Sequence, residues 1–281
     1  MKIRINGADA DIRLETEKTV GEILSALESW LEGTGHRLSG LGIDGSAIAA
    51  DSIEVCFGTE VDSIGVLDIY TSPIADLLAE CLLRVAESID EYEAAGFDER
   101  SSFAVRWKDS PEAGLLFEQS PDLFGRITRA FSGEGFGPQA LRAVVEERLR
   151  ELKDPVGEFE AVGAAIADVC ARLEELPLDI QTGKDAKAAE TVGVFAAVTE
   201  KVLRVLDVLK TSGFPVREIT IGGVPISDYV TGEFHSTLRD LLNAYEQNDT
   251  VLVGDIAEYE VAPRLRGLHS AVLDSVKGTR Q

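Results

Sequence analysis

Hydrophobic residues in the first seventy positions alternate with polar ones in several short segments, interrupted by a single helical stretch. The segment 2–6 alternates and is followed by a turn at Gly7, as in a strand that enters a hairpin. In 20–31 the apolar residues instead recur three and four positions apart, after Thr19 and Glu22, which can cap a helix start reciprocally. Further alternation predicts strands at 10–14, 39–44, 46–49 and 66–70, with a tight turn at Asp44-Gly45.

This order of two strands, a helix and further strands resembles the ubiquitin-like β-grasp fold. The resemblance covers residues 1–71 and rests on element order and apolar spacing. Ubiquitin-like modifiers and sulfur carriers end in a free Gly-Gly whose carboxylate is adenylated. Here Thr71-Ser72-Pro73 occupies the matching place and the chain continues, with Ser72 expected to cap a helix that begins at Pro73. The resemblance therefore implies the fold without the carrier chemistry.

From residue 72 onward the apolar spacing is mostly that of amphipathic helices. The segment 102–118 is ambiguous, because 102–107 alternates and the PEAG sequence beginning at Pro111 is typical of a turn. Pro263 is expected to kink the last helix, and a hairpin is predicted at 217–226. The predicted helices are 73–95, 121–131, 138–152, 156–175, 184–212, 233–247 and 250–277.

The fold class predicted from these patterns is α+β, with a β-grasp domain at 1–71 and a mostly helical domain at 72–281. The sequences RLREL at 148–152 and RLRGL at 264–268 hint at an internal repeat. A duplication would divide the helical region into related units at 72–180 and 181–281. Chance similarity between helices rich in Leu and Glu is the alternative interpretation.

The chain carries a large negative charge, with 50 acidic and 27 basic residues and a net charge of −23. Such a field repels phosphate backbones and anionic membranes, so we expect no nucleic-acid partner. It suits a protein partner with a basic surface, or it serves solubility alone. Residues 1–71 contain 13 acidic and 5 basic side chains, a net charge of −8 out of −23 for the chain. The negative charge is therefore not confined to one end.

Three features of the sequence favour a cytoplasmic protein. The N-terminal MKIRIN lacks the apolar core of a signal peptide. No apolar run approaches the roughly 18 residues of a membrane span. Cys56, Cys81 and Cys170 are widely separated and odd in number, which indicates reduced thiols rather than a disulfide framework.

Two glycine-containing stretches and three histidines are candidates for chemistry. The stretch 133–138 precedes a helix as a phosphate-binding loop does, but Glu134 would repel phosphate and a helix, not a strand, comes before it. The stretch 182–185 resembles the end of a P-loop motif, but Leu178 stands at the position where that motif has its first glycine. The histidines share no helical face at metal-binding spacing: His36, His235 and His269. We therefore assign no catalytic, cofactor-binding or metal-binding residue, and expect no cofactor.

Two tryptophans and several acidic pairs complete the list of candidates. Either tryptophan could anchor a protein partner, although Trp30, beside Leu31, is expected at the edge of the core. Acidic pairs on helices are expected to form solvated faces.

By elimination, the expected function is that of a non-catalytic cytoplasmic adaptor or scaffold that binds proteins. One alternative is an acidic helical chaperone of the secretion or flagellar-export type, which would expose an apolar groove. Another is an enzyme whose site assembles from scattered carboxylates or a metal. These patterns do not specify the oligomeric state.

Overall fold

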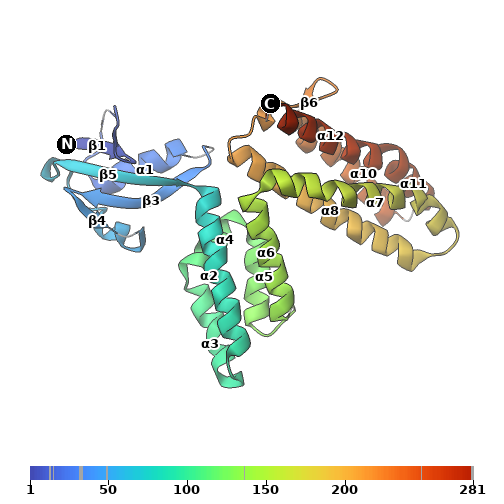
Figure 1. Ribbon diagram of the computed structural model, residues 1–281, viewed down its shortest axis with the longest axis horizontal. Helices are drawn as coiled ribbons and strands as arrows, with labels where there is room; N and C mark the ends of the chain where they lie inside the picture. The colour runs from blue at the N-terminus through green and yellow to red at the C-terminus, as the bar shows by residue number, and fades with distance from the viewer. Residues whose placement is uncertain are drawn as a thin grey trace. The chain divides into compact units, whose positions relative to one another are not determined.

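The structure is a computed structural model that describes residues 1–12, 14, 16–31, 34–48, 50–135, 137–247 and 249–279. It divides into two compact units, residues 1–152 and 153–281. A mixed sheet at the start of the chain is followed by helices, which confirms the α+β class (Figure 1).

The first unit begins with a five-stranded sheet in the order β2-β1-β5-β3-β4. The two neighbours β1 and β5 are parallel, and the other pairs are antiparallel. Helix α1 (Val20–Leu31) shares one apolar cluster with the sheet, an arrangement compatible with a β-grasp fold. The strands are β1 (Lys2–Ile5), β2 (Ala8–Asp9), β3 (His36–Ile43), β4 (Ser46–Ile48) and β5 (Val66–Pro73).

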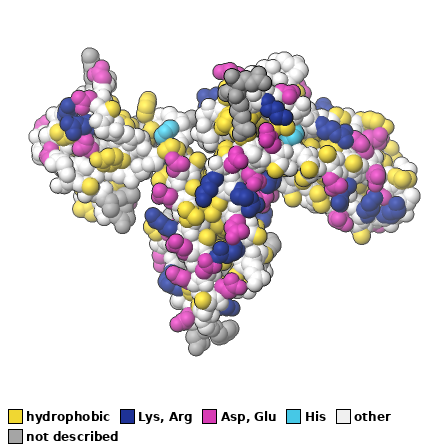
Figure 2. Space-filling model, in the orientation of Figure 1, with side chains coloured by type: hydrophobic (Ala, Val, Ile, Leu, Met, Phe, Trp, Pro, Cys, Tyr) yellow, Lys and Arg dark blue, Asp and Glu magenta, His cyan; other side chains and the backbone are white. Residues whose placement is uncertain are grey.

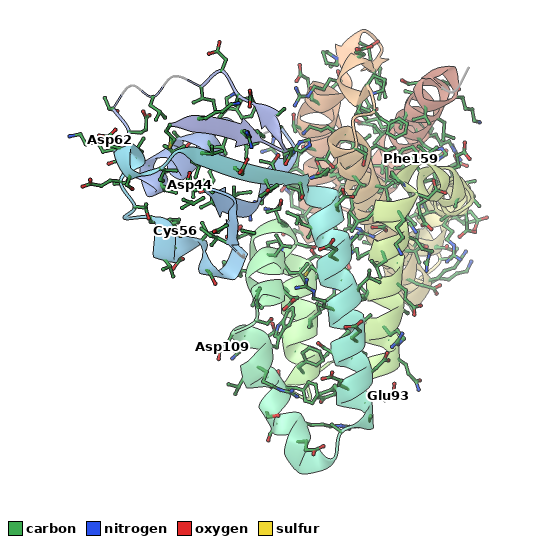
Figure 3. The ribbon with its side chains drawn as sticks, turned by 60° about the vertical axis from the view of Figure 1, so that its left-hand side comes forward. Asp44, Cys56, Asp62, Glu93, Asp109 and Phe159 are labelled. Carbon is green, nitrogen blue, oxygen red and sulfur yellow. The ribbon has the colours of Figure 1, made fainter. Side chains whose placement is uncertain are left out.

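The predicted turn at Asp44-Gly45 is confirmed, and it is hydrogen-bonded to the start of β5. Asp44 and Gly45 both have positive φ, 49° and 86°, as in the two-residue turns that fit the twist of a hairpin. The Asp44 carboxylate, labelled in Figure 3, accepts hydrogen bonds from the backbone N–H groups of Gly65 (2.9 Å) and Val66 (2.7 Å). The turn therefore fixes the beginning of β5.

The predicted helix cap at Ser72 is wrong. Ser72 and Pro73 belong to β5, where they pair with β3, and the Ser72 hydroxyl lies 2.9 Å from that of Ser39. The backbone N–H of Ile74 still donates to the carbonyl of Gly35 at 2.8 Å. Pairing with β3 thus holds these residues extended, and α2 begins only at Ile74.

Helices α2 to α6 pack around a second apolar cluster, in which the Phe131 ring lies 5.3 Å from Tyr92 and 5.9 Å from both Phe103 and Trp107. The ambiguous segment 102–118 belongs to two helices, which are separated by Asp109 and Ser110. Phe103 and Trp107 are four residues apart and both buried, and Pro111 begins a helix capped by the Ser110 hydroxyl. The helices are α2 (Ile74–Ala94), α3 (Phe97–Lys108), α4 (Pro111–Gln119), α5 (Pro121–Phe131) and α6 (Pro138–Lys153).

The second unit has one continuous apolar cluster that runs from Val156 to Val276. A division at 180/181, as the repeat suggested, would separate α7 from α8, which pack against each other. The predicted hairpin is confirmed as β6 and β7. The elements are α7 (Pro155–Gln181), α8 (Asp185–Thr211), β6 (Thr220–Ile221), β7 (Val224–Pro225), α9 (Ile226–Asp228), α10 (His235–Glu246), α11 (Thr250–Ile256) and α12 (Ala262–Thr279).

Two widened helical turns flank α10 and α11. One π-helical segment, Tyr229–Phe234, leads into α10, and another, Ala257–Val261, joins α11 to α12. The predicted helix 250–277 therefore changes register immediately before Pro263, where a widened turn gives the proline ring room. Among the described residues, we find no helix with the length and apolar character needed to cross a bilayer.

Candidate functional site

A shallow apolar groove opens in the N-terminal sheet domain, between α1 and the segment that follows β2. Its volume is about 300 Å3. Eight of its nine lining side chains are apolar, and the exception is a glutamate. They are Ile5, Ile12, Leu14, Glu17, Ile23, Ala26, Leu27, Trp30 and Ile69.

Helix α1 forms one wall of the groove. The predicted capping box is present at the start of this helix. The Glu22 carboxylate accepts from the backbone N–H groups of Lys18 (2.5 Å) and Thr19 (3.2 Å), while the Glu22 N–H donates to the Thr19 hydroxyl at 3.4 Å. From this start, Ile23 and Leu27 fall on one face and are buried against the sheet.

Trp30, one turn beyond Leu27, lies at the rim of the groove. It is 68% exposed, so the expectation that it forms the edge of the core is wrong. The floor beneath it is formed by Ile5 and Ile69, which are direct neighbours on the parallel strands β1 and β5. A large exposed indole beside an open apolar floor is a typical anchor point for a protein partner.

The opposite wall follows β2 and includes Ile12, Leu14 and Glu17. Ile12 is exposed and Leu14 is partly buried, so both contribute apolar surface that the sheet domain does not cover. The Glu17 carboxylate places negative charge at this wall. The groove can therefore accept apolar side chains and favours positive charge nearby.

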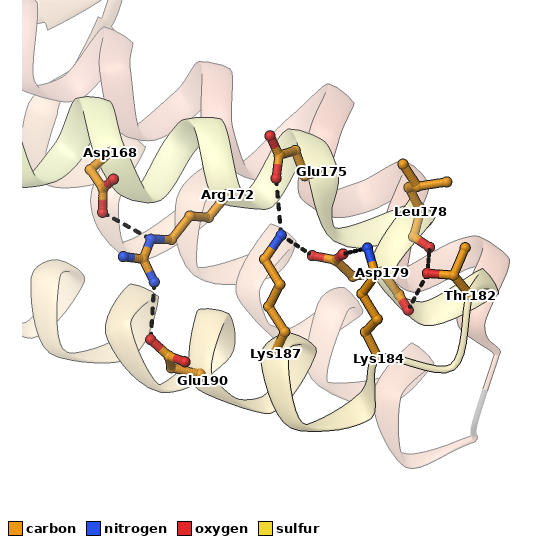
Figure 4. Close-up of polar contacts among 9 residues, drawn as sticks. All are labelled: Asp168, Arg172, Glu175, Leu178, Asp179, Thr182, Lys184, Lys187 and Glu190. Atoms are coloured by element: carbon orange, nitrogen blue, oxygen red, sulfur yellow. Dashed lines mark hydrogen bonds and ion pairs between the residues drawn. The ribbon is translucent and has the colours of Figure 1, made fainter.

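The two glycine stretches of the sequence lie in connections between helices. The stretch 133–138 joins α5 to α6, with Gly133 and Gly135 in left-handed conformation; Phe136 lies outside the described residues. The stretch 182–185 joins α7 to α8, and its Lys184 is directed at a carboxylate of the protein itself (Figure 4).

That carboxylate belongs to Asp179, a buried acid that the sequence analysis did not single out. Lys187 lies 2.8 Å from its Oδ2 and Lys184 lies 3.1 Å from its Oδ1, and Lys187 also contacts Glu175 at 3.1 Å (Figure 4). The hydrogen bond from Lys187, followed by that from Lys184, holds the pKa of Asp179 below its usual value. The cluster lies at the turn between α7 and α8.

The three histidines lie on three different elements, β3, α10 and α12. His269 has a packing role: its ring stacks on Phe159 with centroids 5.2 Å apart, and its Nε2 donates to the Phe159 carbonyl at 3.0 Å. Within the part of the chain that the structure describes, no group of three or more His, Cys, Asp or Glu side chains could hold a metal ion.

The sequence patterns also gave no indication of an ion-pair network around the buried Arg148 in the first unit. Arg148, whose side chain is 8% exposed, lies 2.8 Å from Asp122 and 3.6 Å from the buried Glu151. Of the acidic pairs in the sequence, Glu174 and Glu175 are both exposed, as expected, and each pairs with a basic side chain. The spacing of charged residues in the sequence does not distinguish buried ion pairs from exposed ones.

Comparison with known proteins identifies relatives without a described function. Residues 1–73 match the TP0873 N-terminal domain family, which ends where β5 ends, and residues 165–271 match a domain of unknown function, DUF8042. An uncharacterized protein of Treponema pallidum (strain Nichols) is 23% identical over 280 residues, covering 100% of both chains. No solved structure matches the chain.

Proposed function

We propose that this protein is a non-catalytic adaptor that holds a partner protein through the groove of its N-terminal domain. The observation that carries the proposal is Trp30, a large aromatic side chain left 68% exposed beside an apolar floor. Burial of such side chains supplies much of the binding energy of protein interfaces. An anchor residue of a partner would complete the apolar surface that the domain leaves open.

The partner that fits this groove carries positive charge around an apolar anchor. Glu17 lies in the groove wall, and the N-terminal domain as a whole has a balance of −8. Long-range attraction of this kind raises the association rate more than it prolongs the complex. The association rate should therefore fall as salt rises through physiological ionic strength, where the Debye length is about 8 Å.

The size and chemistry of the groove support binding over the alternative functions. A chaperone that holds unfolded segments would need a groove long enough for a whole segment, whereas a groove of about 300 Å3 suits one or two anchoring side chains. For an enzyme, carboxylates with shifted pKa values would be expected in the groove. Among the described residues, Asp9 and Asp179 have lowered pKa values; both owe the shift chiefly to lysine partners, and neither lines the groove.

A cytoplasmic location is part of the same proposal. It is supported by Cys56, Cys81 and Cys170, all of which are free thiols. Free thiols persist in reducing compartments, whereas oxidising compartments favour disulfides.

Site-specific photo-crosslinking in the native cell tests the proposal. We would place a photoreactive phenylalanine at Ala26, which is exposed and lines the groove, and as a matched control at Ser25, which is exposed on the same helix but does not line it. The expected result is a small set of protein adducts at position 26 that are absent at position 25. Purified partner should then bind a Trp30→Ser variant at least about tenfold more weakly than the native chain, because the anchor surface is lost.

Adducts of the same proteins at both positions would contradict the proposal, because they would show contact without use of the groove. So would a purified partner that binds the Trp30→Ser variant as tightly as the native chain. Thermal unfolding of each variant checks that the fold is retained.

A further inference from the structure

The second unit has an exposed apolar surface of its own, which we call the α10–α11 surface. Its members are large hydrophobic side chains between 43% and 68% exposed, on two short helices and the π turn that follows them. They are Leu242 and Tyr245 on α10, Val251 and Leu252 on α11, and Tyr259 on the π turn.

These side chains lie on elements that are held by packing on their inner side. Helices α10 and α11 pack against each other and against the π turn. On α11 the inward residues Val253, Gly254 and Ile256 are buried in the core of the unit. The exposed residues therefore face solvent from elements that pack against one another, and Figure 2 shows hydrophobic side chains among charged ones on the second unit.

The backbone gives a second, independent reason to regard this surface as functional. The π segments Tyr229–Phe234 and Ala257–Val261 lie immediately before α10 and immediately after α11. Widened turns of this kind cost helical stability and occur frequently at functional sites. Here they bracket the two helices that carry the exposed residues.

The charges in the same stretch are strongly acidic. Residues 235–261 contain six acidic side chains and one basic side chain, Arg239. Two of these acids have local partners: Asp249 caps α11 by accepting from the Leu252 N–H at 3.0 Å, and Glu260 forms an ion pair with Arg264 at 3.2 Å. The acidic side chains are Asp240, Glu246, Asp249, Asp255, Glu258 and Glu260.

We infer that the α10–α11 surface binds a basic amphipathic helix of a partner protein. Apolar side chains on a pair of helices accept the apolar face of a third helix, and the surrounding carboxylates complement its lysines and arginines. An extended peptide would instead need a sheet edge, and in the described part of this unit the sheet is a hairpin of two-residue strands. This inference goes beyond the groove proposed above, since it concerns a second surface on the other unit.

A designed helical peptide tests the inference on the full chain. The probe is a fluorescein-labelled peptide of about 18 residues, or five helical turns, with leucine on one face and lysine on the other. Its binding is followed by fluorescence anisotropy at physiological salt. We expect saturable binding that a Tyr245→Ser/Val251→Ser variant weakens at least about tenfold. A Val105→Ser variant, at an equally exposed valine on α3, should bind within about twofold of the native chain.

Three results would overturn the inference. The first is absence of binding, or equal binding by the native chain and the double variant. The second is equal affinity for a peptide in which alanine replaces every leucine, which would show attraction by charge alone. The third is a native dimer that the double variant converts to a monomer in sedimentation velocity, because the occupant would then be a second copy. None of these results bears on the crosslinks at Ala26, and circular dichroism verifies that each variant is folded.

Discussion

Gly254 on α11 packs against Pro177 on α7 so closely that no side chain fits between them. A Cβ atom added to Gly254 would lie 2.7 Å from the Cβ of Pro177. The contact joins two elements of the second unit that are far apart in sequence. It also explains why α11 needs a glycine at a buried helical position, where alanine would have the higher helix propensity.

A Gly254→Ala substitution should therefore destabilise the protein. We expect the free energy of unfolding to fall by about 1–3 kcal/mol, because the added methyl group overpacks a contact with a rigid ring. Gly193→Ala on α8 is the matched control: that glycine has open space, so alanine should be neutral or raise stability by about 0.5–1 kcal/mol. Urea unfolding measures both changes, and similar effects for the two substitutions would show that the contact is not tight.

Asp179 should make stability depend on pH in the acid range. Its folded-state pKa is lowered, chiefly by the hydrogen bond from Lys187, whereas an unfolded Asp has a pKa of about 3.9. The ionised carboxylate thus stabilises the fold above that pH, and the stabilisation is lost as the pH falls through the folded-state pKa. Asp179→Asn should lower the unfolding temperature clearly at pH 7 and much less at about pH 3.

The control for this prediction is Asp168→Asn. Asp168 forms an ion pair with Arg172 at 2.9 Å, but its side chain is 60% exposed, against 3% for Asp179. Exposed ion pairs contribute little, so this variant should unfold close to the native temperature at pH 7. An equal loss in the two variants would mean that burial of Asp179 has no energetic consequence.

Cys81 should be almost inert toward thiol reagents. Burial, followed by the nearby charge of Glu112, raises the pKa of its thiol to about 12. At pH 8 the thiolate is then about one part in ten thousand, and the thiolate is the reactive form. Cys170 is also buried, whereas Cys56 is partly exposed. Titration with a chromogenic disulfide should show one fast thiol that Cys56→Ser removes, and a fast phase that survives would contradict the assignment.

The two tryptophans should report opposite environments. Trp107 is 5% exposed and its indole N–H donates to the Thr128 hydroxyl at 2.8 Å, whereas Trp30 is 68% exposed. In a Trp107→Phe variant the remaining Trp30 should be quenched by acrylamide several-fold more strongly than Trp107 is in a Trp30→Phe variant. Equal quenching of the two folded variants would place Trp30 in a covered position.

The sequence predicts the fold well where neighbouring residues decide the structure. Thr19 and Glu22 form the expected capping box, and Asp44-Gly45 forms the expected turn, because both motifs are complete within a few residues. Ser72 is different. Its tendency to cap a helix is outweighed by pairing with β3, a segment more than thirty residues earlier in the chain.

The spacing of apolar residues also left two helices incompletely defined. Alternation in 102–107 left this segment ambiguous, whereas in the structure Phe103 and Trp107, four residues apart, both belong to the aromatic core. The predicted helix 156–175 is longer in the structure, where α7 continues through Pro177 to Gln181 with Leu176 and Asp179 buried. The candidate groove could not be predicted for a related reason: Trp30 has the spacing of a core residue, and its exposure depends on where the opposite wall lies.

The π turn at Ala257–Val261 has a consequence for how this chain tolerates insertions and deletions. A helix advances about 100° per residue, so removing one residue from this turn would restore ordinary α-helical geometry and rotate everything beyond it by that angle. Leu265 and Leu268, both fully buried, would then turn away from the core of the second unit. A deletion that improves the local backbone would thus undo the packing of the last helix, so the length of this segment is as constrained as the identity of its residues.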